Sequence, residues 1–222
     1  DLTDRFEAVG FESKKRIRGL SLGIALERRD TWLGGGYTSL NAQLYRGTLD
    51  IRDAMSEAFD KPPFGYGTEG SFGKATVQFA RLQYVMPKLS LYLGGGLQRA
   101  SKNLDTYEKL SLGGPKAVRA YATGEALVDD GWLGTVELRY ALKPEASLFA
   151  FYDAAHGDFF HDPRPVDTFT SRSLRGYGLG FNWSKPGQVT MNLSVAWRGT
   201  GAGLTDGGDR NPRVYWSIQK AF

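Results

Sequence analysis

The stretch QVTMNLSVAWR, residues 188–198, alternates apolar and polar side chains over almost its whole length. Successive side chains of a β-strand point to opposite faces of a sheet, so a period of two gathers the apolar residues on one face. That face carries Val189, Met191, Leu193, Val195 and Trp197, and the other carries Thr190, Asn192, Ser194 and Arg198. The stretch predicts a strand with one apolar and one polar face.

The same alternation recurs and predicts about nine strands of about ten residues, longer than most soluble strands and long enough for a tilted transmembrane strand. The other predicted strands are 20–27, 39–44, 74–86, 88–98, 132–142, 146–155, 176–183 and 213–222. Short connections alternate with long ones (49–70, 101–130, 156–171 and 199–211), as in outer-membrane barrels. We expect an all-β fold, an antiparallel transmembrane β-barrel in the bacterial outer membrane.

A soluble β-sandwich or lipocalin-like barrel would also alternate, but its strands would carry charged residues on the outward face. Here the polar positions are mostly Ser, Thr, Asn, Gln and Gly, as expected for a water-filled lumen. Aromatic residues near strand ends fit the two interfacial girdles of a membrane barrel: Trp132, Tyr140, Trp183, Trp197, Trp216 and Phe222. The pattern favours the membrane barrel, with lipid as one partner.

The composition argues against metal binding, nucleic-acid binding and transmembrane helices. The chain has no cysteine and two histidines, so thiolate metal sites are excluded and we expect no metal and no other cofactor. Its 28 basic residues are spread among 24 acidic ones, and the one basic run, Lys14-Lys15-Arg16, is interpreted as a solvated loop. We therefore expect no nucleic-acid partner. No window approaches the ~18 consecutive apolar residues of a transmembrane helix.

The odd number of predicted strands indicates that further strands precede this chain. If the last strand ends at Phe222 in the periplasm, nine strands leave the polar segment 1–16 outside the cell. Bacterial single-chain barrels have an even number of strands. We expect residues 1–222 to be the C-terminal part of a barrel, with an odd number of strands and any export signal upstream.

Two predicted strands depart from simple alternation. The apolar residues of 74–86 change parity midway, which predicts a β-bulge near Ala80. The strand 146–155 has apolar residues on both parities; if Tyr152 and its parity face lipid, then Phe149, Phe151 and Asp153 face the lumen.

The longest interruption, 101–130, contains SLGGPKAVRAY at residues 111–121. Loops longer than ~15 residues are usually functional or disordered. Gly113-Gly114-Pro115 predicts a tight bend, and Val118 and Tyr121 provide apolar contacts. If the loop folds inward, Arg119 needs a carboxylate, and Asp153 is the expected partner, with Glu137 on the adjacent strand as its rival.

These motifs resemble the two-partner secretion transporters (TpsB type, the haemolysin secretion and activation family). SLGGPKAVRAY followed by GWLGTVELRY resembles the family's sixth extracellular loop and following strand, whose loop carries Leu-Gly-Gly-x-x-x-Val-Arg-Gly-Tyr. LFAFYDAAHG is similar to the family's Phe-x-Asp-x-Gly motif, and RRDTWLGGGYTSLNAQLYRGTLDI resembles an earlier pair of strands. Ala120 stands where the family has glycine. Leu174-Arg175-Gly176-Tyr177 matches the arginine motif by letter, but it lies in an alternating strand.

The resemblance implies a barrel of about sixteen strands, preceded by a plug helix and a pair of periplasmic POTRA domains, that exports a large haemolysin- or adhesin-type partner protein. It implies that the loop folds into the lumen, where Arg119 pairs with Asp153. Gly113, Gly114, Val118 and Tyr121 are then the loop motif, and Phe151 belongs to the strand motif. Trp216 and Phe222 form the expected C-terminal signal for the barrel-assembly machinery.

Two other functions would require different sequence features. A related POTRA barrel that inserts outer-membrane proteins shares the arginine loop and differs in the number of upstream POTRA domains. A barrel hydrolase would need a Ser/His pair facing lipid or lumen, whereas His156 and His161 both fall in a predicted loop. We expect no enzyme, because no catalytic constellation is visible.

Overall fold

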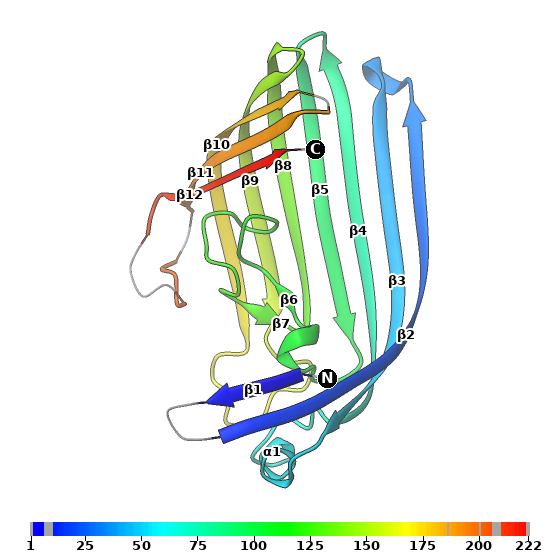
Figure 1. Ribbon diagram of the computed structural model, residues 1–222, viewed down its shortest axis with the longest axis vertical. Coiled ribbons are helices and arrows are strands. Elements are labelled where there is room, and N and C mark those ends of the chain that lie inside the picture. The colour runs from blue at the N-terminus through cyan, green and yellow to red at the C-terminus, as the bar shows by residue number, and fades with distance from the viewer. Residues whose placement is uncertain (1, 7–10, 186, 200, 206–209, 221–222) are drawn as a thin grey trace.

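The computed structural model describes residues 2–6, 11–185, 187–199, 201–205 and 210–220. Ten strands form one antiparallel sheet that follows chain order, with β5 pairing directly with β8 (Figure 1). They are β1 (Leu2–Phe6), β2 (Phe11–Asp30), β3 (Gly36–Ile51), β4 (Gly70–Met86), β5 (Leu89–Ala100), β8 (Asp130–Lys143), β9 (Ala146–Asp158), β10 (Ser171–Lys185), β11 (Val189–Arg198) and β12 (Arg213–Lys220). The other elements are β6 (Leu110–Ser111), β7 (Leu127–Val128), the 3-10 turns η2 (Trp32–Gly34) and η3 (Thr106–Glu108), and α1 (Ala54–Asp60).

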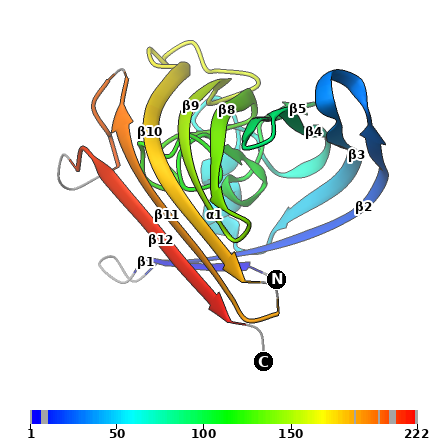
Figure 2. The same cartoon turned by 90° about the horizontal axis from the view of Figure 1, so that it is seen from above.

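The predicted antiparallel all-β fold is confirmed, and each predicted strand overlaps an observed one. Short turns lie at one end of the sheet and long loops at the other, also as predicted (Figure 1). Seen from above, the sheet curves like part of a barrel wall around the loop between β5 and β8 (Figure 2). Within the described residues, no helix is long and apolar enough to cross a membrane.

The prediction that residues 1–16 are a polar segment before the first strand, with Lys14-Lys15-Arg16 in a loop, is wrong. β2 begins at Phe11, and Lys15 pairs in register with both β1 and β3. Lys15 Nζ donates a hydrogen bond to Asp105 Oδ2 at 2.8 Å. Alternation could not reveal this part of β2, because it extends past the apolar outer band and its cation is matched by a loop carboxylate.

The predicted bulge near Ala80 is also wrong. β4 pairs with β5 continuously through Ala80, and the register shifts only between Tyr84 and Met86, beside the turn. The apolar residues change parity because a charged side chain, Arg81, takes an outer-face position. Arg81 Nη1 donates a hydrogen bond to Asp30 Oδ2 at 2.9 Å. An ion pair near the turn interrupts the apolar pattern while the backbone ladder continues.

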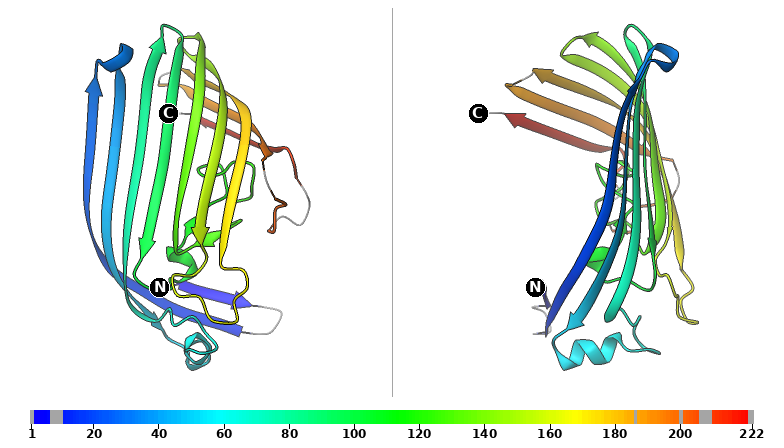
Figure 3. Two further views of the ribbon diagram at one scale, coloured as in Figure 1. Left: turned by 180° about the vertical axis from the view of Figure 1, so that it is seen from behind. Right: turned by 90° about the vertical axis from the view of Figure 1, so that its right-hand side faces the viewer.

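The long strands are seen from behind and from the side in Figure 3. The side chains on their outer face are apolar and exposed. Contiguous exposed apolar area of this kind marks an interaction surface, and alternation with a polar inner face is typical of contact with lipid. The exposed residues include Leu20, Leu22, Ile24, Leu26, Leu44, Val136, Leu138, Leu148, Leu179, Leu193, Val214 and Ile218.

A pair of neighbouring positions on β11 tests which face contacts lipid. Leu193 is on the apolar face, opposite Phe181 and Trp216, whereas Asn192 is on the inner face. We expect Leu193→Arg to destabilise the membrane-inserted protein by about 2–4 kcal/mol and Asn192→Arg to be tolerated. Urea titration of the folded fraction in lipid vesicles measures both. Equal losses in the two variants would contradict the assignment of the faces.

Candidate functional site

The loop between β5 and β8 folds back into the hollow of the sheet (Figures 1 and 2). β6 and β7 pair as a short hairpin inside it. The bend lies at the predicted glycines: Gly114 has a φ of +117°, in the region that favours glycine. A Cβ on Gly113 would lie 2.3 Å from the carbonyl oxygen of Ala122. The tight turn therefore requires glycine at both positions.

One face of the loop packs against β9, β10 and β11. Val118, Ala120 and Tyr121 are fully buried. The apolar cluster around them also includes Leu112, Ala126 and Val128 from the loop and Phe149, Phe151, Ala155, Leu174 and Ala196 from the strands. Gly176 on β10 allows this close approach, because a Cβ there would lie 2.7 Å from the Cβ of Ala120.

The structure accommodates Ala120 in the loop and places the second arginine motif, residues 174–177, in a strand. Among the described non-glycine residues, only Leu33 has a positive φ, so the backbone at position 120 accommodates alanine. The motif 174–177 lies within β10, as predicted, with Leu174 and Gly176 buried on the inner face. Arg175 is exposed on the other face, away from the loop.

Arg119 is buried, with an exposed fraction of 9%, and contacts Asp153 at three points. Its backbone N–H donates to Asp153 Oδ2 at 3.1 Å, Nε donates to the same oxygen at 2.9 Å, and Nη2 donates to Oδ1 at 2.7 Å. Asp153 is itself fully buried. Arginine and carboxylate thus meet in the two-pronged geometry that a guanidinium favours.

Glu137, the alternative partner predicted for Arg119, binds Arg119 at the same time as Asp153 does. Arg119 Nη1 donates to Glu137 Oε1 at 2.6 Å, and Nη2 also donates to Thr135 Oγ1 at 2.9 Å. Arg139 donates to the other oxygen of Glu137 at 2.6 Å and 2.8 Å. Two arginines and two carboxylates therefore form one connected cluster.

The surroundings keep Arg119 charged. Burial alone would lower the pKa of Arg119, but hydrogen bonds and ion pairs with Asp153 and Glu137 outweigh it and raise the pKa. The ring of Phe151 supports the guanidinium from one side, with its centre 3.5 Å from Arg119 Cζ. We call Arg119, Asp153 and Glu137 the loop anchor.

A second anchor, which the sequence did not reveal, holds the return arm of the loop. Buried Glu125 accepts hydrogen bonds from the backbone N–H of Leu204 at 2.7 Å and of Thr205 at 3.1 Å, and pairs with Arg172 Nη2 at 2.5 Å. Burial raises the pKa of Glu125, but these bonds and the Thr205 hydroxyl lower it more. No local pattern could have identified Glu125, because Leu204 and Thr205 lie in a different long loop.

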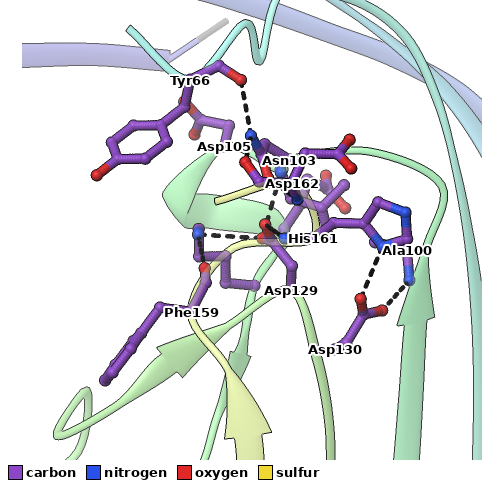
Figure 4. A network of polar contacts seen from close by, with 12 residues as sticks. Tyr66, Ala100, Asn103, Asp105, Asp129, Asp130, Phe159, His161 and Asp162 are labelled. Carbon is purple, nitrogen blue, oxygen red and sulfur yellow. Dashed lines mark hydrogen bonds and ion pairs between the residues drawn. The ribbon is translucent and has the colours of Figure 1, made fainter. Parts of the chain in front are cut away.

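A third polar network ties together the base of the loop (Figure 4). Asp129, fully buried, accepts from the backbone N–H of Leu104 at 3.2 Å and of His161 at 3.0 Å, and pairs with Lys109 at 3.0 Å. Burial raises the pKa of Asp129 despite Lys109. Asp130 accepts from the Ala100 N–H at 2.7 Å. Two long loops are thereby fastened to each other.

The other predicted residues lie outside this loop. Trp216 is 72% exposed on the outer face of β12, and Phe222 lies outside the described residues. His161 is in a loop as predicted, but His156 is not: it lies in β9, with Nδ1 2.8 Å from Ser173 Oγ. The strand extends past its lipid-facing part, which the apolar pattern could not indicate. No cluster of His, Cys, Asp or Glu in the described residues could hold a metal ion.

Comparison with known proteins gives consistent results. A profile of the family described as haemolysin secretion/activation protein ShlB/FhaC/HecB matches residues 12–183. The heme/hemopexin transporter protein HuxB of Haemophilus influenzae strain Rd is 26% identical over 204 residues, 88% of this chain and 35% of HuxB. HuxB of strain 86-028NP matches to the same extent.

Among solved structures, CdiB from Escherichia coli superposes with a TM-score of 0.61 at 20% identity, covering 89% of this chain and 36% of CdiB. That likeness concerns the fold. The chain thus spans about a third of the length of these relatives. Because the family profile covers most of the strands and the whole inward loop, the chain belongs to the ShlB/FhaC/HecB family of haemolysin secretion/activation proteins.

Proposed function

We propose that this chain forms part of an outer-membrane pore that secretes a large partner protein, of the haemolysin or adhesin type, by two-partner secretion. One observation carries the proposal: a loop is held in the hollow of an outward-apolar sheet by a buried arginine between two carboxylates. Family membership supports protein export, and the apolar outer face supports contact with outer-membrane lipid.

We further infer that residues 1–222 are the C-terminal part of a larger barrel, with more strands and POTRA domains upstream. The chain spans about a third of its relatives, and the described strands form an open sheet with β1 and β12 at its edges. The proposed roles follow from this arrangement. The strands form the wall, and the loop between β5 and β8 occupies one side of the lumen.

The loop anchor would hold that loop in its resting position. A polypeptide passes either beside the loop or after the loop has moved, and either route depends on where Arg119 holds it. The anchor consists of hydrogen bonds and ion pairs, which water in the lumen can replace, so the loop can be released without unfolding the wall. The protein's task is passage and gating rather than bond chemistry.

The test is secretion by the full-length protein. Expressed in a Gram-negative host with the candidate partner encoded beside it, the protein should deliver that partner to the medium, and deletion of residues 103–128 should change secretion without preventing insertion. Immunoblots of medium, periplasm and outer membrane measure this. Partner retained in the periplasm beside an inserted, unaltered transporter would contradict the proposal. Loss of other outer-membrane proteins on gene deletion would instead support an insertase.

A further prediction concerns the C-terminal signal. Trp216, Ile218 and Val214 share the exposed outer face of β12, and the chain ends on Phe222. In a full-length protein that ends at Phe222, deleting this residue should lower outer-membrane levels at least about five-fold, more than the loss of its burial alone would cause, because the assembly machinery reads such an ending. Quantitative immunoblots of outer membranes check it, with Leu204→Ala in a loop as control. Unchanged levels would count against the signal.

A further inference from the structure

The inner face of β3 and β4 carries a row of uncharged polar side chains that the loop anchor does not use. Ser39, Asn41 and Gln43 follow one another on β3, and Gln78 and Thr76 lie directly opposite Asn41 and Gln43 on β4. We call these five residues the polar ladder. Within the described part of the chain none of their side chains has a hydrogen-bond partner, and Asn41, Gln43 and Gln78 are exposed.

The polar ladder lines a cavity of about 800 Å³ between this wall and the loop. The opposite side is formed by Gly113–Ala117 and Thr123, and Gly94 and Gly96 on β5 add a floor without side chains. The charged residues of the lining are two lysines: Lys74, which pairs with Glu108 at 2.7 Å, and Lys116 on the loop. Lys74 lies next to the ladder on β4 and its charge is matched by Glu108, so the polar ladder itself presents an uncharged, hydrogen-bonding surface.

We propose that the polar ladder is a binding track for an extended, unfolded polypeptide, recognised through its backbone; this rests on the proposed secretion function. A carboxamide offers both a donor and an acceptor, as a peptide unit does. Positions i and i+2 of a strand are about 6.6–6.8 Å apart, which is also the dipeptide repeat of an extended chain. A chain running along β3 would meet a matching group at every second residue.

The same features explain why the track would not retain its occupant. Each protein hydrogen bond replaces one with water, so its net gain is small, and a row of weak sites permits movement from one to the next. A charged wall would hold segments of opposite charge and repel the others. An oligosaccharide would be expected to stack on aromatic faces, but the ring of Tyr92, which lines the cavity, is covered by Arg139 at 4.4 Å.

A photoreactive peptide tests the track without requiring the natural partner. The probe is a peptide of about 20 residues of Asn, Ser, Thr and Gly, long enough to span the cavity when extended, with benzoylphenylalanine at its centre. Irradiated with the full-length protein in lipid vesicles, it should crosslink to β3, β4 or β5, as mapped by mass spectrometry. Asn41→Leu/Gln43→Leu/Gln78→Leu should lower the yield about ten-fold.

The matched control removes three carboxamides from the inner face of another wall. Asn182→Leu/Asn192→Leu/Gln219→Leu should leave the yield unchanged. Crosslinks confined to β10–β12, an equal loss in the control, no crosslinking at all, or displacement by maltohexaose as effective as by unlabelled peptide would overturn the proposal. Peptide crosslinking to the ladder by a protein that secretes no partner would contradict the proposed function but leave the track supported.

Discussion

Replacing Arg119 or Asp153 with alanine in the full-length protein is expected to depress partner secretion strongly while leaving barrel insertion largely intact. Both side chains are buried: removing Arg119 leaves Asp153 without its cation, and removing Asp153 leaves Arg119 with Glu137 as its remaining carboxylate. Breaking such a buried pair costs about 3–5 kcal/mol in the loop's docked state. The wall keeps its backbone ladder, and the loop loosens. Immunoblots of medium and outer membrane measure secretion and insertion, and maleimide labelling of buried Ala126→Cys measures release of the loop.

Arg175 provides the matched control, because it belongs to the second arginine motif and is exposed on the other face of β10. Arg175→Ala should secrete normally. The double variant Arg119→Ala/Asp153→Ala should be no worse than the worse single variant, because one interaction is lost once. Normal secretion by Arg119→Ala would eliminate the anchoring role.

Double-mutant cycles, with maleimide labelling of the loop as the readout, can measure separately how strongly Arg119 is coupled to Asp153 and to Glu137. Asp153 accepts three hydrogen bonds from Arg119, whereas Glu137 accepts one and is shared with Arg139. We therefore expect coupling of Arg119 to both residues, and stronger coupling to Asp153. Coupling to Glu137 alone would show that Asp153 is not the main partner.

Residues 1–222 expressed alone should not form a closed monomeric pore. In the described strands, β1 pairs with β2 only at residues 11–15, so the rest of that edge of β2 has no strand beside it, and β12 is the other edge of the sheet. In lipid each unpaired backbone amide costs several kcal/mol, so two open edges cannot be tolerated. Refolding into detergent should yield no heat-modifiable monomer on gels and no stable single-channel conductance.

The full-length protein, refolded in the same way, is the control and should show both properties. A discrete, heat-modifiable monomer of residues 1–222 with steady conductance would mean that the two edges can pair with each other. The inference that further strands complete the wall would then be withdrawn.

Most strands of the sheet could be predicted from the sequence, because the requirement that creates their pattern acts on each strand by itself. In 188–198 every second side chain had to suit lipid, and the same requirement acts along each long strand, so a period of two indicated both the strand and its faces. The bend at Gly113 and Gly114 was likewise visible, because glycine allows the backbone conformation found there. Asp153 was expected as the partner of Arg119 because its strand parity faces the lumen, and the family resemblance implied the same pair.

Tertiary structure decided what depends on residues far apart in the chain. β1 and the first part of β2 have no lipid-facing pattern and are strands because neighbouring backbone pairs with them. Glu125 became an anchor because the loop's inward fold brings it to Leu204 and Thr205, 79 and 80 residues away. Arg119 binds both carboxylates because β8 and β9 are adjacent, a relation set by backbone pairing, which side-chain periodicity does not encode.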